Sequence, residues 1–338
     1  MLRFRYYLAF SFLFISGTYL AIPAYYHVPF VKAPGPLMDA NIYRAYQQSI
    51  NKDKPSVVLI GDSTLDHGVD ETYLSNLTNK SVYKLARHGS ASAAWYLLLK
   101  NNIINARHKP EQVAIFFRGT MLTTPEFRTT GTYQVLLDEL AKPDDQLLID
   151  LAYISQMNWL EKKLDSYFPL YAHRQLVRTS LERVIKYPFL ESALNLNGTE
   201  VDEAVNKVFG DSQIAQLNAI INAVDSYLYQ PEKLDFEAQL PRSFLPEIIR
   251  LCKENDIQLV LVRIKVQEFP TLESQPVGMH EYVNSLEQYL SQNDVIFLDF
   301  GTDPRIDPGD FYDPLHMTEA GQKTFTEILA ESLKEVVP

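Results

Sequence analysis

The chain has 338 residues, which is enough for one large domain or two ordinary ones. Its 46% hydrophobic and 22% charged residues are close to globular averages and exclude global disorder and a fibrous repeat. The single cysteine, Cys252, excludes an intramolecular disulfide framework and a cysteine-rich zinc site. The net charge of −11 argues against nucleic acid as a partner, because phosphate binding normally needs an excess of Lys and Arg.

An uncharged apolar run from Tyr6 to about Tyr26 follows Arg3 and Arg5 at the N-terminus. About twenty such residues span a hydrocarbon core of about 30 Å, so we interpret residues 1–28 as a single membrane anchor. The arginines before the run leave the N-terminus in the cytoplasm and send the large domain across the membrane, to the periplasm or cell surface. A cleaved signal peptide is the alternative, although its apolar core is usually shorter, at about 7–15 residues.

Five short apolar runs predict buried parallel strands after a spacer and lead-in segment at 29–54. The runs are Ser56–Ile60, Ser81–Leu85, Val113–Phe117, Gln258–Ile264 and Val295–Phe300. Helical patterns lie between and after them, at Ala91–Asn105, Phe244–Asn255, His280–Gln292 and Thr318–Val336. This alternation predicts an α/β fold with a doubly wound, flavodoxin-like parallel sheet of about five strands and helices on both faces.

A stretch at 131–241 interrupts this alternation between the third and fourth strands. Its pattern is mostly helical, and we interpret it as a helical insertion. It divides the α/β domain into a first part at 55–130 and a second part at 242–338. The insertion is a candidate for a cap over a substrate site, a dimer surface, a dock for a partner or an added structural layer.

Two distant segments carry the residues best suited to chemistry. Ser63 follows the first strand, at the carboxyl edge where open α/β sheets build their sites, although Asp62-Ser63 is also an ordinary helix N-cap sequence. Asp313 and His316 lie three residues apart after the last strand. This spacing lets the carboxylate hold one ring nitrogen while the other faces a nucleophile. The sequence therefore predicts Ser63 as nucleophile, His316 as base and Asp313 as the group that orients the base.

These segments resemble the SGNH (GDSL-type) hydrolase superfamily. Gly61-Asp62-Ser63 matches its nucleophile block, and Asp313-Pro314-Leu315-His316 matches its Asp-x-x-His block. The resemblance covers about residues 55–125 and 243–337. It implies an oxyanion hole that uses backbone N–H groups of Ser63 and of Gly89, which follows the second strand.

The segment after the third strand departs from that family. The family usually has an Asn that completes the oxyanion hole, whereas this chain has Arg118. Arg118 is a candidate donor in its place, or it holds a carboxylate of the fold. His88 and Arg128 are further candidates for substrate binding, and His67 is more typical of a surface position or of a position beside the site residues. Metal-ligand spacing and a Gly-rich phosphate loop are both lacking, so the sequence predicts neither a metal nor a cofactor.

With its anchor and insertion, the chain also resembles the SGNH domains of alginate-type polysaccharide O-acetyltransferases. That resemblance implies an acyl-Ser63 intermediate, an acyl-ester substrate such as a cell-surface polysaccharide, and a polytopic membrane acyltransferase as partner. Transfer to a sugar hydroxyl and hydrolysis by water use the same three residues. An alternative is therefore a carbohydrate or lipid esterase. A further alternative is a non-catalytic protein that binds polysaccharide or serves as a scaffold.

Overall fold

A computed structural model describes residues 2–36, 38, 45–143, 145–174, 176–178, 180 and 225–336. The chain divides into a first unit, residues 1–37 with 153–217, and a second unit, residues 38–152 with 218–338. The predicted insertion at 131–241 contributes to both units, and its residues 181–224 lie outside the described part of the chain. The insertion as a separate domain stays a prediction.

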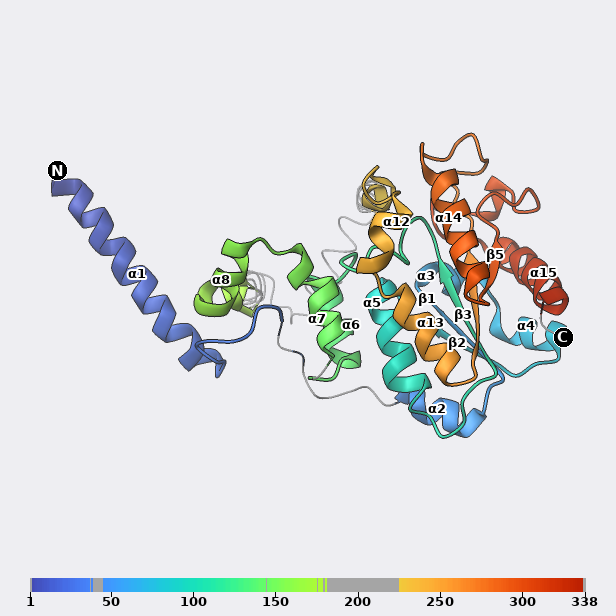
Figure 1. Ribbon diagram of the computed structural model, residues 1–338, viewed down its shortest axis with the longest axis horizontal. Helices are drawn as coiled ribbons and strands as arrows, with labels where there is room; N and C mark the ends of the chain where they lie inside the picture. The colour runs from blue at the N-terminus through green and yellow to red at the C-terminus, as the bar shows by residue number, and fades with distance from the viewer. Residues whose placement is uncertain are drawn as a thin grey trace, which may run out of the picture. The chain divides into compact units, whose positions relative to one another are not determined.

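A five-stranded parallel sheet is the centre of the second unit (Figure 1). Its strands are β1 (Val57–Gly61), β2 (Val82–Ala86), β3 (Gln112–Phe117), β4 (Gln258–Arg263) and β5 (Ile296–Asp299). The spatial order is β2-β1-β3-β4-β5, and all neighbours are parallel. The prediction of a doubly wound sheet is confirmed. The chain turns to opposite sides of β1 to form β2 and β3, and sites in such folds lie at the carboxyl edge near this switch point.

The helices of the second unit lie around the sheet. They are α2 (Ala45–Asp53), α3 (Ser63–Gly68), α4 (Glu71–Thr78), α5 (Ser92–Leu97), α6 (Thr132–Leu140), α7 (Gln146–Ala152), α12 (Phe236–Gln239), α13 (Leu245–Glu254), α14 (Met279–Gln292) and α15 (Glu319–Val336). A π-helical segment, Leu98–Ile103, continues α5, so the helix predicted over Ala91–Asn105 changes its hydrogen-bond pattern halfway. Short 3₁₀ turns lie at Ser226–Tyr229, Leu240–Arg242 and Pro308–Asp310.

Helices cover both faces of the sheet. On one face, α3, α4 and α15 contribute Leu65, Leu74 and Phe325 to a cluster with side chains of β1, β3 and β4. On the other face, α13 packs on β4 and α14 on β5 (Figure 1). Burial on both faces explains why the strands are continuous apolar runs rather than alternating ones. Because all five strands are parallel, the loops that follow them meet at one edge.

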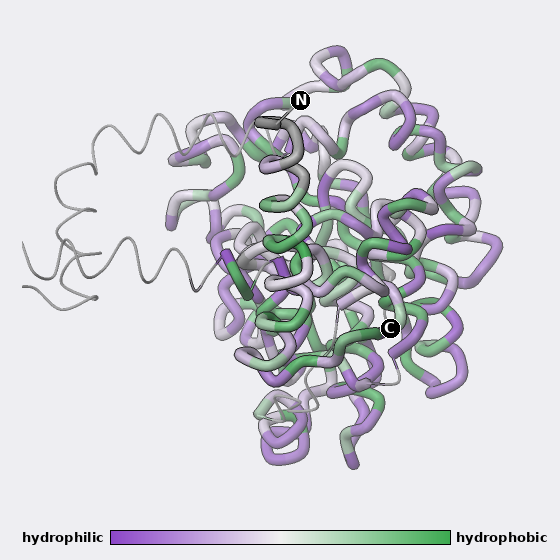
Figure 2. Tube along the Cα trace, turned by 90° about the vertical axis from the view of Figure 1, so that its left-hand side faces the viewer, coloured by the Kyte–Doolittle hydropathy of each residue, from purple (hydrophilic) through white to green (hydrophobic). Residues whose placement is uncertain are grey.

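The first unit contains the N-terminal helix α1 (Leu2–Tyr26), α8 (Trp159–Tyr167), α9 (Pro169–Ala172) and a 3₁₀ turn at Ile154–Gln156. Within α1, the 18 residues Ala9–Tyr26 have a mean hydropathy of 1.2 and are 11% buried. In Figure 2 this helix runs from the N label and is coloured mostly white to green. The helix is long and apolar enough to cross a membrane, and a signal sequence shares these properties.

Candidate active site

Ser63 is the first residue of α3, directly after the end of β1. Asp62 is the N-cap of this helix, and its carboxylate accepts hydrogen bonds from the backbone N–H of Thr64 at 2.9 Å and its hydroxyl at 2.7 Å. Gly61 keeps the turn tight, because a Cβ at this position would lie 2.7 Å from the Cβ of Leu65. Asp62 is therefore an N-cap, and the same turn holds Ser63 at the carboxyl edge of the sheet.

Asp313 and His316 lie in the loop between β5 and α15. The Oδ1 atom of Asp313 accepts the backbone N–H groups of Leu315 and His316, each at 2.8 Å. Thr318 caps α15, because its hydroxyl accepts the N–H of Gly321 at 3.1 Å. These local hydrogen bonds fix the carboxylate and the imidazole relative to the helix that follows them.

Of the three residues that the sequence predicted as one group, His316 lies within hydrogen-bond distance of both Ser63 and Asp313. His316 Nε2 is 2.8 Å from Ser63 Oγ, and His316 Nδ1 is 2.7 Å from Asp313 Oδ2. In a neutral imidazole, Nδ1–H donates to Asp313 and Nε2 accepts the hydroxyl proton of Ser63. This geometry is what a serine nucleophile and its general base require.

The charge on Asp313 is stabilised by its own loop. Burial alone would raise the pKa of Asp313, but hydrogen bonds from the His316 ring and from the backbone N–H groups of Leu315 and His316 hold the pKa below its usual value. The carboxylate is therefore ionised at neutral pH. An ionised partner stabilises the positive charge that His316 acquires when it takes a proton.

Gly89 lies in the loop after β2, which is tied to the end of β1. Its φ of +74° is in the left-handed region, and a Cβ there would lie 2.7 Å from Cε1 of Tyr133. The neighbouring Ser90 donates its hydroxyl hydrogen to the carbonyl oxygen of Gly61 at 3.0 Å. The loop that carries Gly89 is thus fixed beside the nucleophile turn, and the oxyanion role of its N–H stays a prediction.

Arg118 is buried against two carboxylates. Its side chain is 2% exposed. Nη1 donates to Asp62 at 2.6 Å and Nε donates to Asp225 at 2.9 Å. Arg128 makes longer contacts with the same two acids, at 3.3 and 3.4 Å. Of the two roles that the sequence allowed Arg118, the structure describes the ion pair, and the roles of Arg118 and Arg128 toward a substrate stay predictions.

This ion-pair network changes the pKa of the residue before the nucleophile. Burial would raise the pKa of Asp62, but the positive charges of Arg118 and Arg128 and the hydrogen bonds from Thr64 lower it to about 2. The sequence did not reveal the second acid, Asp225. It is 107 positions from Arg118 along the chain and belongs to no recognisable motif.

Two other histidines lie near the proposed base. His88 is mostly exposed, and its Nε2 is 2.9 Å from Oδ2 of Asp66. The ring of His67 is 4.9 Å from that of His316, centroid to centroid, in an edge-on arrangement. Burial, and then repulsion from the neighbouring imidazole of His316 when that ring is charged, hold the pKa of His67 below its usual value. Of the two positions that the sequence allowed, His67 thus takes the one beside the site residues.

Asp66, His67 and His88 also form a group whose possible metal-ligand atoms lie within 4.8 Å of one another. Spacing along the sequence did not reveal this group, because His88 follows the next strand. Lys84 already places its ammonium group 3.1 Å from Asp66. That positive charge opposes a cation at the same carboxylate, and we assign no metal to the group.

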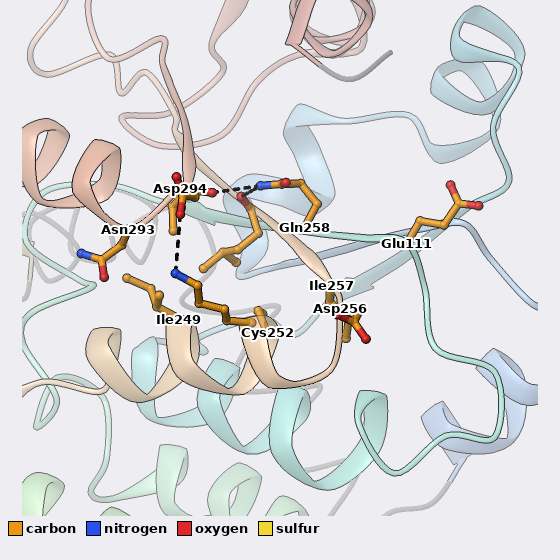
Figure 3. Close-up of a pocket in the computed structure, with 11 residues that line it drawn as sticks. Glu111, Ile249, Cys252, Asp256, Ile257, Gln258, Asn293 and Asp294 are labelled. Carbon is orange, nitrogen blue, oxygen red and sulfur yellow. Dashed lines mark hydrogen bonds and ion pairs between the residues drawn. The ribbon is translucent and has the colours of Figure 1, made fainter.

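A pocket of about 350 Å³ lies at the opposite edge of the sheet (Figure 3). Gln258, the first residue of β4, and Asp294, just before β5, line it together with Cys252 of α13. Ser63 follows the carboxyl end of a parallel strand, whereas this pocket lies at the amino ends. The pocket therefore does not belong to the candidate site.

No family model and no curated protein matches the chain. Several solved structures are similar to it. A candidate acylhydrolase from Bacteroides fragilis is 11% identical with a TM-score of 0.41, over 88% of this chain and 98% of that chain. A GDSL-like lipase from Bacteroides thetaiotaomicron is 11% identical with a TM-score of 0.38, over 87% and 98%. A variant of an acetyl-xylooligosaccharide esterase from Geobacillus is 12% identical with a TM-score of 0.35, over 83% and 94%.

Likenesses of this size do not establish an activity, so the function has to be argued from the site itself. The structure does bring the two sequence blocks together at one edge of a parallel sheet, as the resemblance implies. In its nucleophile block, its Asp-x-x-His block and the sheet that joins them, the chain is similar to the SGNH (GDSL-type) hydrolases.

Proposed function

We propose that the chain is an acyl-ester enzyme that acts through Ser63. The observation that carries this proposal is the hydrogen-bonded series from Ser63 to His316 to Asp313, at 2.8 and 2.7 Å. A serine hydroxyl is a poor nucleophile until a positioned base accepts its proton, and the base needs a partner that holds its ring. The chain supplies both from one loop.

In the first half of the reaction, Ser63 Oγ attacks the carbonyl carbon of the ester while His316 Nε2 accepts the hydroxyl proton. The carbonyl oxygen becomes an oxyanion, for which we propose the backbone N–H groups of Ser63 and Gly89 as donors. Asp313 stabilises the imidazolium. The C–O bond to the alcohol then breaks, His316 returns the proton to the leaving oxygen, and the acyl group remains on Ser63.

In the second half, His316 removes a proton from the incoming hydroxyl, whose oxygen attacks the acyl-Ser63 carbonyl. The bond between the acyl carbon and Ser63 Oγ then breaks, and His316 returns the proton to Oγ. Water as the acceptor gives an esterase, and a sugar hydroxyl gives an acyltransferase. We favour acetyl transfer to or from a cell-surface polysaccharide. The support for this choice is the apolar α1 together with the resemblance to alginate-type enzymes, which also suggests a polytopic membrane acyltransferase as partner.

We further propose that α1 anchors the chain in the cytoplasmic membrane with the large domain outside. The support is the uncharged run after Arg3 and Arg5. Alkaline extraction of membranes should leave the chain in the pellet. Protease added to intact spheroplasts should digest the large domain, and full protection would contradict this orientation.

The activity is tested with the purified full chain in detergent, p-nitrophenyl acetate as donor and an oligosaccharide as acceptor. Ser63→Ala and His316→Ala should each lower turnover by about 10⁴-fold or more. Asp313→Asn should leave more activity, because this carboxylate only orients and stabilises the imidazole. Ser63→Ala combined with His316→Ala should be no worse than either change alone, because the groups act as a unit.

Ser291→Ala and His108→Ala are matched controls, because both side chains are exposed and neither belongs to the proposed site. Both should retain full turnover. Acetyl on the oligosaccharide, detected by mass spectrometry, indicates transfer, whereas free acetate alone indicates an esterase. If Ser63→Ala keeps wild-type turnover, the catalytic proposal is wrong and a binding or scaffold role takes its place.

A further inference from the structure

α8 begins at a well-defined cap that fixes the direction of its first residues. Asn158 Oδ1 accepts the backbone N–H groups of Leu160 at 2.9 Å and Glu161 at 3.0 Å, and Glu161 Oε2 accepts the N–H of Asn158 at 2.8 Å. Trp159 is the first residue inside this capping box. The side chains of the first turn are therefore presented from a rigid helix start and not from a loose loop.

Those side chains are apolar and uncovered. Trp159 is 76% exposed, Leu160 49% and Tyr167, at the other end of the helix, 54%. A tryptophan is one of the largest apolar side chains, so its exposure leaves a large apolar area in contact with water. Lys163 lies between these residues on the same helix, with its ammonium 5.3 Å from the centre of the Tyr167 ring.

The helix is tied to the segment that leaves α1. The ammonium of Lys32 is 2.6 Å from Oδ2 of Asp165 in α8, and both side chains are buried. The same carboxylate oxygen accepts the backbone N–H of Gly35 at 2.8 Å, and the backbone N–H of Lys32 donates to the carbonyl of Ser166 at 3.3 Å. α8 cannot leave this segment without separating a buried ion pair, which is costly.

The same segment holds α8 near the last turns of α1. α9 packs against both α1 and α8. Phe30 folds back onto α1, with its ring 5.8 Å from that of Tyr19. Figure 1 shows α8 beside the C-terminal end of α1. If α1 crosses a bilayer, its last turns lie at the membrane surface, and α8 lies at that level too.

We propose that α8 docks on the lipid bilayer that α1 enters, with Trp159 and Leu160 at the boundary between headgroups and acyl chains. This proposal rests on the proposed anchoring of α1 and is independent of the chemistry at Ser63. Trp and Tyr are enriched at membrane interfaces, because their rings are apolar with one polar edge. Lys163 can bury its stem there and keep its ammonium among anionic headgroups. α8 thus holds the first unit against the membrane surface.

The test uses the full chain reconstituted into vesicles of phosphatidylcholine and phosphatidylglycerol that carry brominated acyl chains. The chain has two tryptophans, and the other one, Trp95, is fully buried in the second unit. Bromine quenches only a nearby tryptophan. We expect a loss of up to about half of the tryptophan emission, which corresponds to one residue of two. Quenching should be stronger with bromine near the headgroup than at the chain end.

Trp159→Phe is the matched control, because the change is at an exposed position and leaves Trp95 as the only tryptophan. Its emission should be unaffected by the brominated lipid. The proposal is overturned if wild type and Trp159→Phe are quenched equally. It is also overturned if neither protein is quenched, and that result would favour a protein partner for this face. Flotation of the vesicles reports the anchoring separately: a chain that does not float refutes both anchoring and docking. Hydrolysis of p-nitrophenyl acetate in the same vesicles tests the Ser63 proposal on its own.

Discussion

The buried guanidinium of Arg118 allows a sharp test of what holds the nucleophile loop. In Arg118→Ala, Asp62 and Asp225 would lose hydrogen bonds of 2.6 and 2.9 Å. Both carboxylates are almost fully buried, at 1% and 5% exposed. Among the residues that the structure describes, the contacts of Arg128, at 3.3 and 3.4 Å, would remain to balance their charges.

The expected cost follows from this burial. Removing one partner of a buried ion pair costs about 3–5 kcal/mol, because it leaves an uncompensated charge. A domain of about 150–250 residues loses about 2–4 °C of melting temperature per kcal/mol, so we expect a decrease of about 6–20 °C. The pKa of Asp62 is lowered from 3.8 to about 2, which also indicates that the ion pairs stabilise the folded chain. This shift corresponds to about 2 kcal/mol at that carboxylate alone.

The measurements are thermal melting by circular dichroism and ester turnover well below the melting temperature. Arg250→Ala is a matched control, because Arg250 pairs with Glu247 and Glu254 on an exposed helix surface and its loss should leave melting unchanged. For Arg118→Ala we expect a large decrease in melting temperature with most turnover retained. Unchanged melting together with a decrease of about 10²–10³-fold in turnover would refute this reasoning and assign Arg118 to the oxyanion hole.

Three further predictions follow from individual residues. Because its pKa is lowered, ionised Asp62 stabilises the fold by about 2 kcal/mol above about pH 4, and this contribution should be lost as the pH falls toward 2. Urea unfolding of wild type and Asp62→Asn at several pH values measures it. Burial raises the pKa of Cys252 to about 12, so Ellman's reagent should react only on unfolding, and fast reaction of the native chain would contradict this. Gly89→Ala should cost about 1–3 kcal/mol in the same unfolding assay because φ is +74°, whereas Gly309→Ala, with no atom within 4 Å of its added Cβ, should be neutral.

Local patterns along the chain are enough to predict the parallel sheet and the three residues of the candidate site. Strands buried on both faces appear as short apolar runs, so β1, β3 and β4 could be found without knowing their neighbours. The carboxyl ends of parallel strands converge, and the residues after them could therefore be expected to meet. That reasoning brought Ser63 together with Asp313 and His316, and the structure places His316 Nε2 2.8 Å from Ser63 Oγ.

The surroundings of these residues depend on tertiary packing, which local patterns do not report. The pairing of Arg118 with Asp225 depends on how the last part of the predicted insertion packs back against the sheet, 107 positions along the chain. Packing between distant segments also brings His67 close to His316. In the same way, it attaches α8 through Asp165 to Lys32. Local patterns report whether a residue is buried and in which kind of element. They do not report which charged partner a buried side chain meets, because that choice depends on packing between distant segments.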